Sequence, residues 1–162
     1  MKRPTILLFL IIIFFSCSGN DHGAGNLQAR IDSLKEELAN SYKPGLGEFM
    51  SDILVHHSKL WFAGKNKNWP LATFELQEIN ESITDIKTYD QDRKEIKYLY
   101  ILNESLDSLK QAIKDKSETH FEQAFHGLTV RCNECHTVNN YAFNVIRVPE
   151  SPPFSNQDFS GK

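Results

Sequence analysis

Residues 96–113 read IKYLYILNESLDSLKQAI, and their apolar side chains recur at steps of three and four residues. This leucine stripe consists of Ile96, Leu99, Leu102, Leu106, Leu109 and Ile113. Because an α-helix completes a turn in about 3.6 residues, the spacing brings these side chains onto one face. The segment therefore predicts an amphipathic helix that buries this face against other parts of the chain.

Three other segments carry apolar stripes with the same spacing, and each predicts a further helix. Their members, in chain order, are Leu46, Met50, Ile53, His57 and Leu60, then Ala72, Leu76, Ile79, Ile83 and Ile86, and finally Phe121, Phe125, Leu128, Cys132 and Cys135. Four amphipathic helices joined by short loops bury their stripes most simply as an antiparallel bundle. We therefore predict an all-α fold, with an up-and-down four-helix bundle in residues 44–140.

Local signals indicate where these helices begin. Asn68 is a good N-cap for the second helix, with Pro70 tolerated in the first turn. Thr88 and Gln91 have the spacing of a capping box, which predicts that the helix of the leucine stripe begins there. No Gly or Pro marks the start of the last helix, so we expect its first residue between positions 115 and 119.

The N-terminus has the pattern of an export signal. Lys2 and Arg3 precede an apolar run that is about half of the roughly 20 residues needed to span a membrane. We therefore expect residues 1–16 to be a cleaved signal peptide. Ser16 directly before Cys17 resembles the lipobox of bacterial lipoproteins, which implies an acylated Cys17 that anchors the chain to a membrane. Ordinary secretion with an unmodified Cys17 is the alternative.

The charge of the mature chain is acidic. Loss of two basic residues with the signal peptide reduces the 18 Lys and Arg to 16 against 21 Asp and Glu, a net charge of about −5. Nucleic acid is therefore not an expected partner. A chain of 162 residues is also too short for two well-packed cores, so one domain is expected.

Segments of different composition flank the predicted bundle. Residues 17–43 are expected to hold the lipid anchor, a small polar linker over residues 18–26 and a stalk helix that ends at Pro44-Gly45. The apolar stripe of the stalk helix is Leu27, Ile31, Leu34 and Leu38. Residues 141–162 are expected to form an extended tail, since three prolines prevent a helix there.

The last helix ends in a motif with specific chemistry. Residues 132–136 read CNECH, the C-x-x-C-H signature of covalent haem c attachment. Cys135 and His136 follow Cys132 by three and four residues, so all three side chains emerge from one face of a helix. The two sulfurs can form thioethers with the porphyrin vinyl groups while His136 coordinates the iron. Together with lipidation of Cys17, one haem c accounts for every cysteine in the chain.

Three other interpretations of this motif are weaker. A disulfide between Cys132 and Cys135 would strain a helix and leave His136 unexplained. A reactive dithiol requires the pair at the N-terminus of a helix, where the thiolate is stabilised, whereas this pair ends one. A zinc site would need additional cysteines or clustered histidines at suitable spacing.

The residue on the other side of the iron determines the chemistry. If the first and last helices are antiparallel, this residue comes from the first two turns after residue 44. Met50 lies within these two turns and on the apolar stripe, so we predict Met50 as the distal ligand. His57, about 10 Å deeper at 1.5 Å per residue, and an open site remain alternatives. The other histidines lie off the stripe or too far along the last helix: His56, His120 and His126.

Three further features of the helices bear on a haem. Arg131 could pair with a propionate, although an arginine that faces solvent is equally ordinary. Gly127 costs about 1 kcal/mol relative to Ala within a helix, which suggests a close approach by another helix or by the macrocycle. Four aromatic residues are expected in the core, some of them lining the haem: Trp61, Trp69, Phe121 and Phe125.

A haem motif at the end of the last of four amphipathic helices resembles the cytochrome c prime family, the class II c-type cytochromes. The resemblance covers about residues 44–140 and rests on Cys132, Cys135, His136 and the helix order. It implies an up-and-down bundle whose distal residue comes from the first helix, where Met50 stands. Family members with methionine there are six-coordinate electron carriers, and members with an apolar residue there bind nitric oxide or carbon monoxide. The lipid anchor, the stalk helix and the proline-rich tail depart from the family.

The sequence thus predicts a monohaem cytochrome lipoprotein that faces the periplasm or the cell surface and transfers single electrons. A five-coordinate protein that binds nitric oxide or carbon monoxide is the alternative. We expect no catalytic residues, so the chain is not predicted to be an enzyme. The expected partners are the membrane and a redox protein, whose basic surface the acidic chain would attract, and a homodimer is compatible with the sequence.

Overall fold

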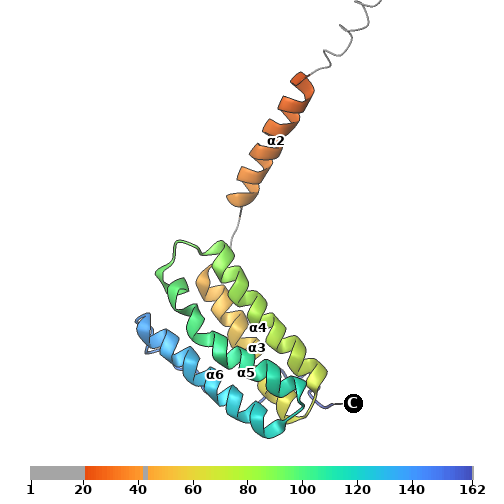
Figure 1. Cartoon of the computed structure of the whole chain (residues 1–162), viewed down its shortest axis with the longest axis vertical. Helices are drawn as coiled ribbons and strands as arrows, with labels where there is room; N and C mark the ends of the chain where they lie inside the picture. The colour runs from red at the N-terminus through yellow and green to blue at the C-terminus, as the bar shows by residue number, and fades with distance from the viewer. Residues whose placement is uncertain (1–20, 42–43, 162) are drawn as a thin grey trace, which may run out of the picture. The chain divides into compact units, whose positions relative to one another are not determined.

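The computed structural model describes residues 21–41 and 44–161, which form helices, turns and loops without a strand. The helices are α2 (Asp21–Ala39), α3 (Leu46–Lys65), α4 (Trp69–Tyr89), the 3₁₀-helix η1 (Lys94–Leu102), α5 (Asn103–Lys114) and α6 (Glu118–Val138) (Figure 1). The predicted all-α class is confirmed. The chain divides into two compact units between residues 43 and 44. The predicted signal peptide and Cys17 lie outside the described residues.

The first unit contains α2, which carries the predicted amphipathic stripe. All four stripe residues are exposed: Leu27, Ile31, Leu34 and Leu38. The helix begins at Asp21, inside the stretch expected to be a linker, and ends at Ala39, five residues before Pro44. Among the described helices, none combines the length and the apolar character that crossing a membrane requires.

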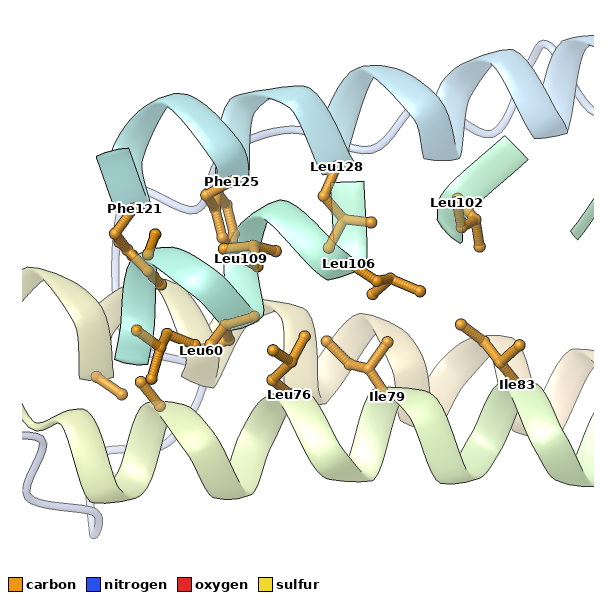
Figure 2. Close-up of a cluster of buried hydrophobic side chains, with 14 of the residues drawn as sticks. Leu60, Leu76, Ile79, Ile83, Leu102, Leu106, Leu109, Phe121, Phe125 and Leu128 are labelled. Carbon is orange, nitrogen blue, oxygen red and sulfur yellow. The ribbon is translucent and has the colours of Figure 1, made fainter. Parts of the chain in front are cut away.

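The second unit is built from helices that pack around one hydrophobic core. α3 and α5 each pack against both α4 and α6, and η1 also contacts α4, α5 and α6. These contacts are compatible with a helical bundle. Figure 2 shows side chains from all of these elements converging on the core. Burial of a large core side chain contributes about 1.5–3 kcal/mol. The core side chains with almost no exposed surface include Leu60, Ile79, Ile86, Leu99, Leu109, Phe121, Phe125 and Leu128.

The leucine stripe is buried apart from Ile96, which is half-buried, but its first half is not α-helical. Residues 94–102 form η1, and α5 begins only at Asn103. Ile96, Leu99 and Leu102 follow one another at steps of three, the repeat of a 3₁₀-helix. The later members of the stripe follow at the steps of four and three that an α-helix requires. The change of helix type therefore matches a change of period in the sequence.

The predicted capping box at Thr88 and Gln91 is wrong. Thr88 lies inside α4, which continues to Tyr89. Its hydroxyl donates to the carbonyl of Thr84 at 2.9 Å, and the Gln91 side chain donates to the Thr88 carbonyl at 3.1 Å. Both side chains thus satisfy carbonyl groups at the end of one helix instead of amide groups at the start of the next.

The other predicted helix starts agree with the structure. The Asn68 side chain accepts a hydrogen bond from the Leu71 amide at 3.2 Å and caps α4. The last helix, α6, begins at Glu118, inside the expected window, with Ser117 as its N-cap. A short-chain polar residue at the N-cap satisfies one of the free amide groups of the first turn.

Three helices end in the same backbone motif. The residue after each C-cap has a left-handed conformation, with φ of 58°, 52° and 67° at Lys67, Lys116 and Asn140 respectively. In α6 the Tyr141 amide then donates to the carbonyl of His136 at 2.7 Å, which is the long hydrogen bond of a Schellman motif. Glycine is the usual residue at this position, and none of the three helix ends has one.

Residues 141–161 contain no helix or strand, and they pack against the helices. The ring of Phe159 is buried 5.8 Å from the ring of Phe62 in α3. Beyond the end of α3, the Asn68 side chain donates to the carbonyl of Ser160 at 3.0 Å. This segment therefore contributes to the core of the second unit.

Gly64, near the end of α3, packs directly against an aromatic ring of α6. A Cβ atom added to Gly64 would lie 2.1 Å from the ring of Phe121 in α6, so only glycine fits there. At Gly127 an added Cβ would meet nothing nearer than the Ser105 hydroxyl at 3.8 Å, an ordinary contact. Packing of the neighbouring helix therefore does not require glycine at Gly127, and a close approach of the macrocycle there stays a prediction. Gly64 was not predicted to have a packing role.

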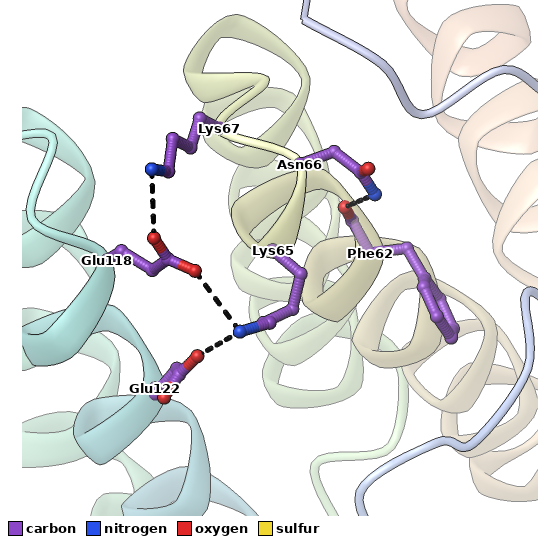
Figure 3. A network of polar contacts seen from close by, with 6 residues as sticks. All are labelled: Phe62, Lys65, Asn66, Lys67, Glu118 and Glu122. Atoms are coloured by element: carbon purple, nitrogen blue, oxygen red, sulfur yellow. Dashed lines mark hydrogen bonds and ion pairs between the residues drawn. The ribbon is translucent and has the colours of Figure 1, made fainter.

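Charged side chains connect the C-terminal end of α3 to the N-terminal end of α6, beside Gly64 (Figure 3). The Lys65 ammonium bonds to Glu122 and, at 3.2 Å, to Glu118. Lys67 lies 3.0 Å from the other oxygen of Glu118. The hydrogen bonds to Glu122 and Glu118 raise the pKa of Lys65. Because these groups are all exposed by about a third or more, solvent screening limits their contribution to stability.

Candidate functional site

A cavity of about 140 Å³ lies among α3, α4, η1, α6 and the segment after α6. The predicted proximal motif and both predicted distal candidates line this cavity together. Its wall comprises Met50, Ser51, Ile53, Leu54, His57, Ile79, Leu99, Leu102, Leu128, Cys132, Cys135, His136, Asn144 and Ile146. Most of these side chains are apolar, as in typical cofactor pockets.

A second cavity, of about 200 Å³, adjoins the first. The two cavities share Met50, Leu99, Cys135, His136 and Asn144. Each is smaller than the roughly 300–1,000 Å³ of typical small-molecule pockets. A macrocycle would therefore have to occupy both cavities and displace the side chains between them.

The ring of His136 is held by one hydrogen bond at Nδ1. This atom lies 2.6 Å from the carbonyl oxygen of Asn144. Because a carbonyl can only accept, Nδ1 carries the proton and donates, which leaves the lone pair on Nε2. Within residues 44–161, no hydrogen bond or ion pair engages Nε2. A metal-binding histidine has the same arrangement, with its second ring nitrogen donating to a carbonyl group.

The segment after α6 is bound to the motif through Asn133. The Asn133 amide donates to the carbonyl of Ile146 at 2.9 Å, and its oxygen accepts from the amide of Ile146 at 2.8 Å. The same side chain donates to the Thr129 carbonyl one turn earlier in α6, at 3.0 Å. Neither Asn133 nor Asn144 was predicted as a site residue, because their contacts depend on the path of residues 141–146.

Both cysteines of the motif are free thiols in this structure, not a disulfide. Burial raises the pKa of Cys132 to about 12 and also raises the pKa of Cys135. Both groups are therefore protonated at neutral pH. Reactive cysteines have lowered pKa values, so these thiols lack the electrostatic activation of a dithiol redox site.

The described residues include no group of three or more His, Cys, Asp or Glu side chains that could hold a metal ion. A zinc site of the usual composition is therefore not formed by this part of the chain. A haem iron is different, because the porphyrin supplies four nitrogen ligands and the protein supplies one or two. The donors at this site, two thiols, Nε2 of His136 and the thioether of Met50, fit a haem c.

His57 differs from Met50 in its surroundings. Its side chain is buried, and burial lowers its pKa to about 4, so the imidazole is neutral at pH 7. The hydroxyl of Thr129 donates to the Phe125 carbonyl at 3.0 Å and accepts from Nε2 of His57 at 3.0 Å. This leaves the lone pair on Nδ1 of His57. His57 lines the first cavity only, whereas Met50 lines both.

The remaining histidine candidates line neither cavity. Nδ1 of His56 lies 2.7 Å from a carboxylate oxygen of the buried Glu75. The ring of His126 packs edge-on against Trp61, 5.9 Å away. His120 is exposed at the start of α6. The structure thus brings Met50 and His57 to the motif, and does not bring the other three histidines there.

Arg131 and the aromatic residues also lie outside both cavities. The Arg131 guanidinium bonds to Glu134 at 2.6 Å on its own helix, and a contact with a propionate stays a prediction. Arg93 lines the second cavity instead, 3.1 Å from Glu95. Arg93 was not predicted as a site residue. The four aromatic residues expected to line the haem in part pack against one another near Gly64: Trp61, Trp69, Phe121 and Phe125.

Comparison with known proteins adds no family to this description. No family model, no curated protein and no solved structure matches the chain. The resemblance to the cytochrome c prime family therefore rests on the C-x-x-C-H motif and on the order of the helices.

Proposed function

We propose that this chain is a monohaem c-type cytochrome that transfers single electrons. In this proposal Cys132 and Cys135 bind the haem covalently, His136 is the proximal ligand and Met50 is the distal ligand. α3, α4, α5 with η1, and α6 are the four helices of an antiparallel up-and-down bundle like that of cytochrome c prime, with residues 141–162 as an extended tail. The chain has no catalytic residues and is not an enzyme.

One observation carries the proposal. The two thiols and the imidazole of the C-x-x-C-H motif line one largely apolar cavity, and the hydrogen bond at Nδ1 of His136 leaves Nε2 for a metal. The iron, when bound, supplies a centre that alternates between the ferrous and ferric states. The chain's own residues orient the imidazole through Asn144 and exclude water with apolar side chains such as Leu99 and Leu128.

The position of Met50 supports a six-coordinate site. Met50 is half-buried, packs against the core and lines both cavities, opposite the end of α6. His57 is the alternative ligand, because its hydrogen bond to Thr129 leaves the lone pair of Nδ1 available and its side chain lines the first cavity. A vacant distal position would instead make the chain a five-coordinate protein that binds nitric oxide or carbon monoxide.

The experiment uses the full chain expressed with a haem-attachment system. We expect a haem stain to remain on the chain in a denaturing gel, and to be lost in the double variant C132A/C135A. Absence of covalent haem from the unmodified chain would refute the proposal.

Optical spectra of the ferric protein then identify the distal ligand. We expect a methionine-to-iron charge-transfer band that disappears in Met50→Ala and persists in His57→Ala, its matched control on the same stripe. No such band in the unmodified chain, together with a spectrum altered only by His57→Ala, would identify His57 as the ligand. Carbon monoxide binding that displaces no ligand would support the gas-binding function instead.

The proposal extends to the location of the protein. A cleaved signal peptide over residues 1–16 and an acylated Cys17 would anchor the chain in the cell envelope, facing the periplasm or the cell surface. A redox protein with a basic surface is the proposed partner, because the mature chain carries about five net negative charges. A homodimer is compatible with this arrangement.

A further inference from the structure

The segment of residues 141–146 folds back onto the end of α6 and meets it at three points. The Tyr141 amide donates to the His136 carbonyl at 2.7 Å. The Asn144 carbonyl accepts from Nδ1 of His136 at 2.6 Å. The backbone of Ile146 forms the paired hydrogen bonds with the side chain of Asn133, at 2.8 and 2.9 Å.

Burial holds little of this segment in place. Phe143 is 83% exposed and Val145 is 60% exposed, on either side of Asn144. The Tyr141 hydroxyl bonds to Glu95 at 3.1 Å and attaches the beginning of the segment to η1. The part of the segment that follows Asn144 depends on Ile146, which is half-buried and lines the first cavity.

The paired hydrogen bonds fix both the distance and the orientation of the Ile146 backbone. The Asn133 side chain is itself fixed, because it also donates to the Thr129 carbonyl within α6 at 3.0 Å. The Asn144 carbonyl lies only two residues before Ile146. A rigid attachment at Ile146 therefore restricts where that carbonyl can lie relative to the ring of His136.

We propose that Asn133 is a positioning residue that holds the Asn144 carbonyl against Nδ1 of His136 and thereby fixes the orientation and the donor strength of Nε2. The redox consequence of this inference rests on the proposed haem function, whereas the effect on the imidazole does not. Asn133 thus does more than separate the two cysteines of the motif.

The expected redox effect has a definite sign. A carbonyl that accepts from Nδ1 makes Nε2 a stronger donor, which favours ferric over ferrous iron. Loss of the contact should therefore raise the reduction potential. Removal of such outer-shell partners lowers metal affinity or activity by about 10–100-fold. We expect an effect of similar size on the redox equilibrium, in which a tenfold change of a one-electron couple corresponds to about 59 mV.

Two substitutions of Asn133 separate its contacts. Asn133→Ala removes all three hydrogen bonds. Asn133→Ser keeps a hydroxyl that can donate to the carbonyl four residues earlier, as serine commonly does in helices, but is too short to reach Ile146. Asn80→Ala is the matched control, because Asn80 makes the same bond to the Leu76 carbonyl at 2.7 Å in α4 and forms no hydrogen bond with residues 141–146.

The first measurement is the reduction potential of the haem-loaded full chain. We expect Asn133→Ala and Asn133→Ser to shift the ferric-to-ferrous equilibrium at least tenfold toward ferrous iron, which raises the reduction potential by about 59 mV or more. Asn80→Ala should leave the potential unchanged. Equal potentials for the unmodified chain and both Asn133 variants would overturn the inference. An equal rise in Asn80→Ala would also overturn it, because the effect would then be general destabilisation.

The second measurement requires no haem. Nitrogen-15 chemical shifts of His136 in the haem-free full chain report which ring nitrogen carries the proton. We expect the Nδ1–H form in the unmodified chain and in Asn80→Ala, and a mixture of both neutral forms in the Asn133 variants. An unchanged Nδ1–H form in Asn133→Ser would refute the positioning role, even if the chain were found to bind no haem.

Discussion

The contact between α3 and α6 has two ends that are filled in different ways. At the aromatic end, defined by Trp61, Gly64, Phe121 and Phe125, the rings of Trp61 and Phe125 lie 4.9 Å apart, and Gly64 leaves no room for a Cβ atom. At the cavity end, the first turns of α3 and the last turns of α6 line the two cavities. Met50 and the C-x-x-C-H motif form part of these walls. The same pair of helices is therefore closely packed at one end and open at the other.

The difference follows from side-chain size along the stripe of α6. The stripe begins with two phenylalanines, continues with Leu128 and ends with Cys132 and Cys135. Phe121 and Phe125 have no exposed surface, whereas the small cysteines leave space beside them. Protein interiors are otherwise close-packed with few voids. The decrease in volume thus predicts at which end of the helix a cofactor can fit.

The largest effect is expected from Gly64→Ala at the aromatic end. The new Cβ atom would lie 2.1 Å from the Phe121 ring, which has no exposed surface and packs against Trp61 and Trp69. We expect the free energy of unfolding in urea to fall by about 3 kcal/mol, the upper part of the range for overpacked cores.

Gly127→Ala is the control for this substitution, because its Cβ atom would meet only ordinary contacts. Its stability should be unchanged or higher by about 1 kcal/mol, since alanine favours the helix. Equal losses in both variants would mean that the aromatic end is no more closely packed than the rest of α6.

A smaller effect is expected from pH, through His57 at the junction of the two ends. The ring of His57 lies 4.4 Å from that of Phe125 and lines the first cavity. Burial lowers the pKa of His57 from 6.5 to about 4. Between these values the unfolded chain binds a proton that the folded chain excludes, so stability falls as the pH falls. From pH 7.5 to pH 5 we expect a loss of about 2 kcal/mol from this residue.

The measurement compares urea unfolding at the two pH values in the unmodified chain and in His57→Gln, which cannot titrate. The variant should show a pH dependence weaker by about 2 kcal/mol. The same pH dependence in both proteins would show that His57 is not buried in its neutral form, and that water reaches the core from the cavity end.

The sequence predicted most of the helices because their stripes coincide with the core. It also predicted Met50 near the motif, with His57 as a deeper alternative, because antiparallel packing puts the start of the first bundle helix beside the end of the last. The prediction at Thr88 failed because its spacing to Gln91 fits a helix end as well as a helix start. The step of three from Ile96 to Leu99 and Leu102 carried a signal for η1, but the periods of the two helix types are close.

Other features could not be predicted from local patterns. Gly64 and Gly127 are alike in sequence, and only the packing of α3 on α6 distinguishes them. The role of Asn144 comes from its backbone carbonyl, which every residue has, so its side chain gives no signal. Asn133 contacts a residue 13 positions later, and this contact depends on the turn after α6.

The smallest expected effect concerns the turns that follow α5 and α6. Lys116, after α5, and Asn140, after α6, both have left-handed backbone conformations. This conformation costs non-glycine residues roughly 1–2 kcal/mol, and asparagine tolerates it better than lysine. Glycine removes the strain but loses more chain entropy on folding, about 0.5–1 kcal/mol relative to alanine in regular structure. We therefore expect Lys116→Gly to stabilise the chain by up to about 1 kcal/mol, and Asn140→Gly to have almost no effect.

Urea unfolding of the two variants tests this difference. Lys116 is exposed and makes no ion pair found in the described part of the chain, so its replacement changes little besides the backbone. Lys67 is unsuitable because its replacement would also remove the ion pair with Glu118. A gain from Asn140→Gly as large as that from Lys116→Gly would mean that the turn before Asn144 is strained. The Asn144 carbonyl would then be held at His136 against that strain, and the hydrogen bonds of Asn133 would have to oppose it.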